Sequence, residues 1–231
     1  MRSSRISPHS RLRSALLSKL DFAASHVYSS RGQSELSKSS QVVVRNRLKR
    51  GDPSLLRQLA TRVANLVAEG NFTGFFGNQT TLVPIPGSAP LVRGGLWVPL
   101  LAANELRRVG LARDVLPAIA RVSAVTKSAF VQPAQRPNVQ EHYNSLSVQL
   151  VKPPPQRILL IDDVVTQGCT MLAAASRVAE AYPQAEVRGF AFVRTMSGVE
   201  LEEVVGVGNQ TMVSPCAGII RPRNERAIRQ P

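Results

Sequence analysis

The stretch ILLIDDVVTQGCTM, from Ile158 to Met171, decides both the fold class and where to look for a site. Its four leading apolar residues are typical of a buried strand, and the adjacent carboxylates of Asp162 and Asp163 follow directly. A short polar loop then leads into a run that predicts a helix over 168–181. The unpaired N–H groups and partial positive charge of a helix N-terminus favour a phosphate. Because the two carboxylates would repel a phosphate, we expect them to bind sugar hydroxyls or Mg²⁺ instead.

Along the rest of the chain, segments whose apolar residues have helical spacing alternate with short apolar segments typical of strands. Helices are expected at 11–29, 53–70, 96–109 and 168–181, and strands at 81–85, 115–122, 145–150, 158–161 and 186–193. Residues 30–40 read as a serine-rich loop, 41–49 fit a strand or a helix, and 123–143 read as a long polar loop. The pattern predicts an α/β fold with a mostly parallel sheet flanked by helices and a partly helical N-terminal extension. Ligands of such sheets bind at the carboxyl ends of the strands.

Charge is distributed very unevenly along the 231 residues. Of the formal net charge of +14, residues 1–50 contribute eleven Lys or Arg against two Asp or Glu, whereas residues 51–220 contribute fourteen against twelve. We therefore divide the chain into a basic N-terminal extension (1–70), a nearly neutral core (71–200) and a C-terminal segment with a basic tail (201–231). Basic ends can contact nucleic acid, anionic membrane or an acidic partner, and they can equally be solubilising extensions.

The number of cysteines and the hydropathy of the chain indicate in which cellular compartment the protein is expected. Two cysteines give neither a disulfide framework nor metal-ligand spacing, which favours a reducing, cytoplasmic setting. The longest apolar run is too short for a transmembrane helix, so no membrane association is expected. The first 20 residues carry five basic residues and no acid, a composition that fits an organellar transit peptide or an ordinary amphipathic helix. We favour the amphipathic helix, because Leu12, Leu16, Leu17 and Leu20 have helical spacing.

Other phosphate-binding motifs are absent from the sequence: there is no GxxxxGK[ST] run, and no GxGxxG follows the first strand. The stretch from Ile158 to Met171 resembles the phosphoribosyl-diphosphate motif of the type I phosphoribosyltransferase family, which has two acids, two apolar residues and Thr-Thr-Gly-x-Thr. Here Gln167 replaces the second Thr and Cys169 takes the variable place. The stretch LVPIPGSAPLVRGG (82–95) looks like the strand and pyrophosphate loop of the subgroup that includes the competence protein F family, although Gly95-Leu96-Trp97 departs from that subgroup's pattern.

The resemblance implies a role for each matching residue. Asp162 and Asp163 would bind the ribose hydroxyls and organise Mg²⁺. Thr166, Gln167, Gly168, Cys169 and Thr170 would hold the 5′-phosphate, and Gly87, Ser88 and Arg93 would face the pyrophosphate. The stretch TKSAFVQPAQRPNVQEHY (126–143) lies where the family has its flexible catalytic loop, so Lys127 and Arg136 would close over the site. His142, in the same stretch, has no clear role.

The resemblance implies a Mg²⁺-dependent transferase in nucleotide metabolism. It would join the sugar of 5-phosphoribosyl 1-diphosphate (PRPP) to a nitrogen nucleophile, such as a nucleobase, and release pyrophosphate. A variable hood would form the acceptor site, here from one or both ends of the chain, and a homodimer is compatible with the family. Two alternatives stay open: a non-catalytic sensor of PRPP or a nucleotide, and a DNA-uptake or mobile-element accessory protein whose basic ends bind nucleic acid.

Overall fold

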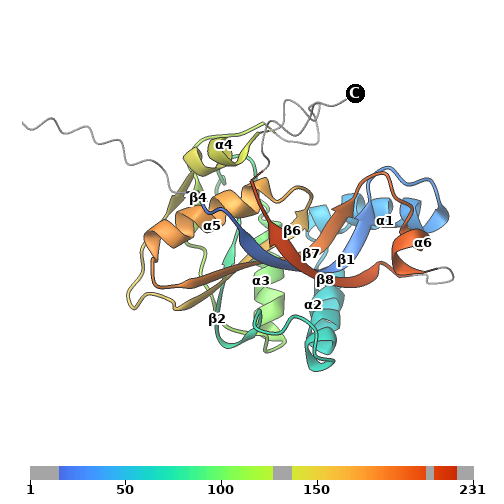
Figure 1. Ribbon diagram of the computed structural model, residues 1–231, viewed down its shortest axis with the longest axis horizontal. Coiled ribbons are helices and arrows are strands. Elements are labelled where there is room, and N and C mark those ends of the chain that lie inside the picture. Colours follow the sequence, from blue (N-terminus) through green and yellow to red (C-terminus); the bar gives the residue numbers. More distant parts are fainter. Residues whose placement is uncertain (1–15, 127–136, 207–210, 223–231) are drawn as a thin grey trace, which may run out of the picture.

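A computed structural model describes residues 16–126, 137–206 and 211–222. Its centre is a six-stranded sheet in the order β3-β2-β6-β7-β1-β8 (Figure 1). All neighbouring pairs are parallel except β1 and β8, so the sheet is mostly parallel, as the sequence predicts. The strands span Leu20–Ser29 (β1), Gly77–Pro84 (β2), Ala112–Val115 (β3), Arg157–Val165 (β6), Glu186–Met196 (β7) and Val213–Ile220 (β8). A separate antiparallel pair joins β4 (Ile119–Arg121) to β5 (Leu146–Val148).

Helices cover both faces of the sheet (Figure 1). They span Glu35–Asn46 (α1), Pro53–Ala68 (α2), Val98–Arg108 (α3), Val139–Asn144 (α4), Cys169–Ala181 (α5) and Leu201–Val205 (α6), with a 3₁₀ turn at Leu48–Arg50 (η1). One apolar cluster joins α1, α2 and α3 to Leu159 and Ile161 of β6. A second joins α4 and α5 to Ile158 and Leu160 on the opposite face. Successive residues of β6 therefore serve different cores, as strand geometry requires.

The N-terminal segment differs most from the sequence-based expectation. The helix expected over 11–29 is wrong over the described residues 16–29: residues 16–19 form no helix, and residues 20–29 form β1, between β7 and β8. All but one residue of this strand is buried, so the strand is covered on both faces, and its buried residues include the polar Ser25, His26 and Ser29. The upstream leucines have helical spacing as far as Leu20, and for this reason the sequence predicts a helix where the structure has a strand.

Two predicted loops contain helices. Helix α1 begins at Glu35, inside the expected serine-rich loop, because the side chain of Ser34 caps it by accepting from the N–H of Ser37. The second is α4, which lies within the expected polar loop 123–143. There Asn138 and Glu141 form a reciprocal capping box at the helix N-terminus. Helix α4 is too short to show apolar periodicity in the sequence, whereas α1 has twelve residues and a serine-rich first turn that is typical of a loop.

Several expectations are confirmed. Asp52 caps α2 by accepting from the N–H groups of Ser54 and Leu55, with Pro53 in the first turn. Strands β2, β6 and β7 and helices α3 and α5 lie where the sequence places them, whereas the strand expected over 115–122 is divided between β3 and β4. In the part of the chain that the structure describes, no helix combines the length and apolarity needed to cross a membrane.

Candidate functional site

The carboxyl ends of β2 and β6 lie side by side. The two strands are parallel neighbours in which Pro84 pairs with Ile161, and the N–H of Ile85 donates to the carbonyl of Ile161 at 2.9 Å. The loop that begins at Pro86 therefore leaves the sheet next to Asp162 and Asp163. The two loops singled out in the sequence thus meet at the end of the sheet where the parallel strands have their carboxyl ends.

The two carboxylates belong to opposite faces of β6, because they are consecutive strand residues. Asp163 is buried, and its Oδ1 accepts from Lys49 Nζ at 2.8 Å and from the N–H of Val164 at 2.8 Å. Asp162 is partly buried, and its Oδ1 accepts from the N–H of Asp163 at 2.8 Å. Helices α1 to α3 cover the Asp163 face, whereas α4 and α5 cover the Asp162 face.

The pKa of Asp162 differs from that of an ordinary aspartate. Burial, reinforced by the charge of Asp163, raises the pKa of Asp162, and Lys49 only partly opposes this. Burial alone would lower the pKa of Lys49, but the attraction of Asp163 and Asp162 outweighs it and the pKa of Lys49 is raised. Lys49 is therefore a stable cation at the acid pair.

Sequence reasoning missed Lys49. It lies in η1, 114 positions before its partner, in a stretch whose charges gave no sign of a particular contact. The ion pair brings the N-terminal 70 residues into the candidate site. The Lys49 side chain as a whole is 49% exposed, against 8% for Asp163.

The predicted phosphate loop follows β6. Gly168 has a positive φ of 78° and directly precedes α5. Thr166 is exposed, and its Oγ1 lies 3.1 Å from Thr195 Oγ1 in β7. Thr170, in the first turn of α5, lies 3.4 Å from His142 Nε2. A Cβ on Gly168 would come within 2.6 Å of Ile220 Cδ1, so this glycine is needed both for the backbone turn and for packing against β8. Gln167 is partly buried, and Cys169 begins the helix.

The predicted pyrophosphate loop is held through its backbone. The carbonyl of Gly87 accepts from Arg121 Nε at 2.8 Å, and that of Ser88 accepts from the N–H of Val125 at 2.8 Å. Trp97 closes the loop by donating its indole N–H to the carbonyl of Ile85 at 2.9 Å. Arg93 is exposed and forms no ion pair within the described ranges. Gly87 and Ser88 thus lie at the expected edge, while Arg93 projects from the same loop.

The three remaining residues of the stretch 126–143 considered in the sequence are Lys127, Arg136 and His142. Lys127 and Arg136 lie outside the described residues. His142 is buried in α4 and faces Thr170, so it belongs to the packed structure around α5. Arg121, which the sequence did not single out, is also buried and holds the Gly87 carbonyl.

Asp162 and Asp163 are the candidate magnesium ligands, and they do not form a complete metal site by themselves. No group of three or more His, Cys, Asp or Glu side chains that could hold a metal forms within the described ranges. Carboxylate oxygens are ligands that Mg²⁺ prefers, and it is usually bound by one or two of them together with substrate phosphates and water. Either carboxylate could supply one such ligand, but the two lie on opposite faces of β6, and Lys49 is already bonded to one oxygen of Asp163.

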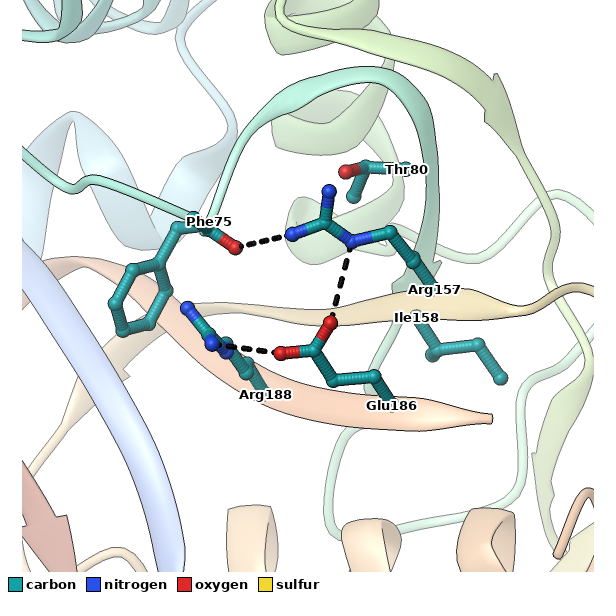
Figure 2. A pocket seen from close by; sticks show the side chains of 7 residues that line it. Phe75, Thr80, Arg157, Ile158, Glu186 and Arg188 are labelled. Carbon is teal, nitrogen blue, oxygen red and sulfur yellow. Dashed lines mark hydrogen bonds and ion pairs between the residues drawn. The ribbon is translucent and has the colours of Figure 1, made fainter. Parts of the chain in front are cut away.

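A small cavity at the opposite edge of the sheet is a poor alternative site (Figure 2). It lies near the amino ends of β2, β6 and β7, where Glu186 pairs with Arg157 at 3.2 Å and with Arg188 at 2.6 Å. Its volume of about 10 Å³ is enough for a single water, which could satisfy the buried Thr80 hydroxyl. We assign this network to stability.

In comparisons with known proteins, no protein-family model and no curated protein matches this chain.

Proposed function

We propose that this protein is a Mg²⁺-dependent phosphoribosyltransferase with the type I fold, acting on PRPP and a nitrogen nucleophile. The observation that carries the proposal is the meeting of two loops at the carboxyl ends of β2 and β6. One loop offers backbone groups and Arg93, and the other offers an acid pair followed by a helix N-terminus. This order along the edge fits a ligand with pyrophosphate at one end, a sugar diol in the middle and a phosphate at the other end.

The 5′-phosphate is assigned to residues 166–170. The first N–H groups of α5 have no partner within their own helix, and the thirteen-residue helix adds a favourable dipole. The hydroxyls of Thr166 and Thr170 supply further donors. The ribose hydroxyls donate to Asp162 and Asp163, and the pyrophosphate lies along Gly87 and Ser88 within reach of Arg93.

The reaction exchanges one bond at C1 of the ribose for another. The C1–O bond to pyrophosphate breaks, and pyrophosphate leaves with the bonding electron pair. A nitrogen lone pair of the acceptor forms the new C1–N bond, and that nitrogen loses a proton to solvent. Positive charge develops on the sugar ring in between, so the neighbouring carboxylates stabilise the transition state.

The acid pair would hold Mg²⁺ together with substrate oxygens, and the metal when bound would stabilise negative charge on the leaving pyrophosphate. Arg93 would contribute to the same stabilisation from the other loop. Lys127 and Arg136 keep the role implied by the sequence, which is to close over the bound substrate.

A screen for pyrophosphate release tests the activity. The full chain would be incubated with PRPP, Mg²⁺ and a panel of purine and pyrimidine bases, with Asp162→Asn/Asp163→Asn as the inactive reference. Release with at least one base that the double variant abolishes is the expected result. Release that is equal in both proteins, or none with any acceptor although PRPP binds, would overturn the transferase assignment.

The ion pair between Lys49 and Asp163 favours a second candidate, a PRPP or nucleotide sensor without catalysis. A carboxylate that already has a cationic partner can bind a sugar hydroxyl without any metal. In that case PRPP would bind equally well with and without Mg²⁺, and no pyrophosphate would form. Of the fifteen Lys and Arg residues in 1–50 and 221–231, on which a nucleic-acid role would depend, seven lie in 1–15 and 223–231, outside the described ranges.

A further inference from the structure

A buried arginine lies directly behind the two loops of the candidate site. Arg121, in β4, is only 4% exposed. Its Nε donates to the carbonyl of Gly87, and its Nη1 donates to Ser145 Oγ, just before β5. Burial lowers the pKa of Arg121 to about 10, so the guanidinium stays charged at neutral pH. Arg121 therefore links the first loop to the residues that follow α4.

The hydrogen-bonded chain continues from Ser145 to the second loop. Because Ser145 Oγ donates its only hydrogen to the carbonyl of His142 at 2.7 Å, it must accept from Arg121. The imidazole of His142 then reaches α5, where Nε2 lies 3.4 Å from Thr170 Oγ1. Three buried residues, Arg121, Ser145 and His142, thus lie between Gly87, which is exposed, and Thr170, which is partly buried.

His142 is held neutral in this environment. It is 5% exposed, and burial, with the charge of Arg121, lowers its pKa to about 4, although Glu141 opposes this. A neutral imidazole carries one N–H, on either Nδ1 or Nε2. Nδ1 is buried without a partner among the described residues, so a hydrogen there would be an unpaired buried donor. Only the Nε2–H form gives the ring hydrogen an acceptor, namely Thr170 Oγ1.

We propose that His142 is a positioning residue, whose Nε2–H donates to Thr170 Oγ1 and thereby leaves the Thr170 hydroxyl hydrogen to donate to a substrate phosphate oxygen. The inference rests on the proposed function, because that function places a phosphate at the start of α5. Arg121 and Ser145 act one step further back, by fixing the end of α4 that carries His142. The ligand class at Thr170 is a phosphomonoester.

Substitutions at the two residues separate positioning from simple packing. The probe is ribose 5-phosphate, titrated calorimetrically into the full chain at pH 7. Thr170→Val removes the donor and should weaken binding roughly tenfold, whereas Thr170→Ser keeps it and should bind like the wild type. His142→Asn cannot place a donor at the Nε2 position and should weaken binding about threefold to tenfold, and His142→Gln, whose amide reaches that position, should restore most of the affinity.

The double variant gives the decisive comparison. If His142 acts through the hydroxyl, His142→Asn has no further effect on ribose 5-phosphate binding once Thr170 is Val. Equal weakening by His142→Asn in both backgrounds would show a packing effect and overturn the inference. Failure of His142→Gln to restore binding, in a variant that unfolds at the same urea concentration as the wild type, would overturn it too.

Nitrogen-15 NMR of histidine-labelled free protein tests the hydrogen bond without any ligand. The expected tautomer of His142 is Nε2–H. An Nδ1–H tautomer overturns the inference even if the wild type binds ribose 5-phosphate, in which case the proposed function stands. An Nε2–H tautomer in a protein that binds no ribose 5-phosphate overturns the proposed function, and with it the ligand assigned to Thr170.

Discussion

Lys49 Nζ lies 2.8 Å from Asp163 Oδ1 and so fixes the N-terminal segment to the acid pair at the end of β6. The pair joins two residues that are 114 positions apart. An exposed ion pair would contribute little to stability, but here the carboxylate is buried and has one strong cationic partner. The charge at the acid pair therefore depends on Lys49, which lies outside the predicted core of residues 71–200.

Removing Lys49 should strengthen metal binding to the free protein. The ammonium repels a divalent cation at the same carboxylates, and at about 5 Å even water-like screening leaves a repulsion worth roughly tenfold in affinity. We expect Lys49→Met to bind Mg²⁺, or Mn²⁺ as its paramagnetic substitute, about tenfold more tightly. Calorimetry measures this, with Lys152→Met, an exposed lysine, as the control. Unchanged or weaker binding would show that Lys49 does not compete with a metal.

Substitution of Arg93 tests the role of the first loop. Arg93 forms no ion pair within the described ranges, so its loss should not affect folding. Arg93→Met should weaken pyrophosphate binding about tenfold, because a charge-assisted hydrogen bond contributes roughly that much. The matched control is Arg113→Met, on exposed β3. Equal affinity in both variants would remove Arg93 from the site.

Gly168 should tolerate a side chain much less well than another glycine of the same conformation. Both Gly168 (φ 78°) and Gly110 (φ 83°) are left-handed, which costs an alanine roughly 1–2 kcal/mol. Only Gly168 faces a neighbour, because its Cβ would lie 2.6 Å from Ile220 Cδ1, and such crowding adds roughly 1–3 kcal/mol. Urea unfolding of Gly168→Ala and Gly110→Ala measures the difference.

A second substitution, at Ile220, checks whether crowding causes the loss of stability in Gly168→Ala. In the Gly168→Ala background, Ile220→Ala removes the atoms that crowd the new methyl group, so it should destabilise less than it does in the wild type. Equal free energies of unfolding for the two glycine variants would mean that β8 does not pack on the phosphate loop as described.

Two buried histidines should make the protein less stable in mild acid. Burial lowers the pKa of His26 and of His142 to about 4. The unfolded chain binds these protons near pH 6.5 and the folded chain does not, so stability is fully present above about 6.5 and falls as the pH decreases toward 4. Each histidine should contribute a loss of about 2 kcal/mol between pH 7 and 5.

Urea unfolding at the two pH values checks this dependence. In His142→Gln, where the residue cannot titrate, the loss between pH 7 and 5 should be about 2 kcal/mol smaller than in the wild type. His26→Gln should behave in the same way. A loss that is unchanged in either variant would mean that the substituted histidine is charged or exposed in the folded protein.

The features that could be predicted from the sequence are those formed by residues close to one another in the chain. The strand before Asp162, the loop to Thr170 and the Asp52 cap of α2 depend on neighbouring residues, so their pattern is visible in the sequence. The N-terminal strand was missed because upstream leucines have helical spacing and because burial on both faces removes the alternation of a strand. Lys49 and Arg121 were missed because their partners are distant in sequence, and only the fold brings them together.

The acid pair and the helix after it form the proposed PRPP site. Calorimetric titration of PRPP with Mg²⁺ into the full chain tests it most directly, with Asp162→Asn/Asp163→Asn as the test variant. Asp114→Asn, an exposed carboxylate on β3, is the control. We expect saturable binding by the wild type and Asp114→Asn, and at least about tenfold weaker binding by the double variant, because it loses charged partners of the ribose hydroxyls and the metal. Absence of binding by the wild type, or equal binding by all three proteins, would contradict it.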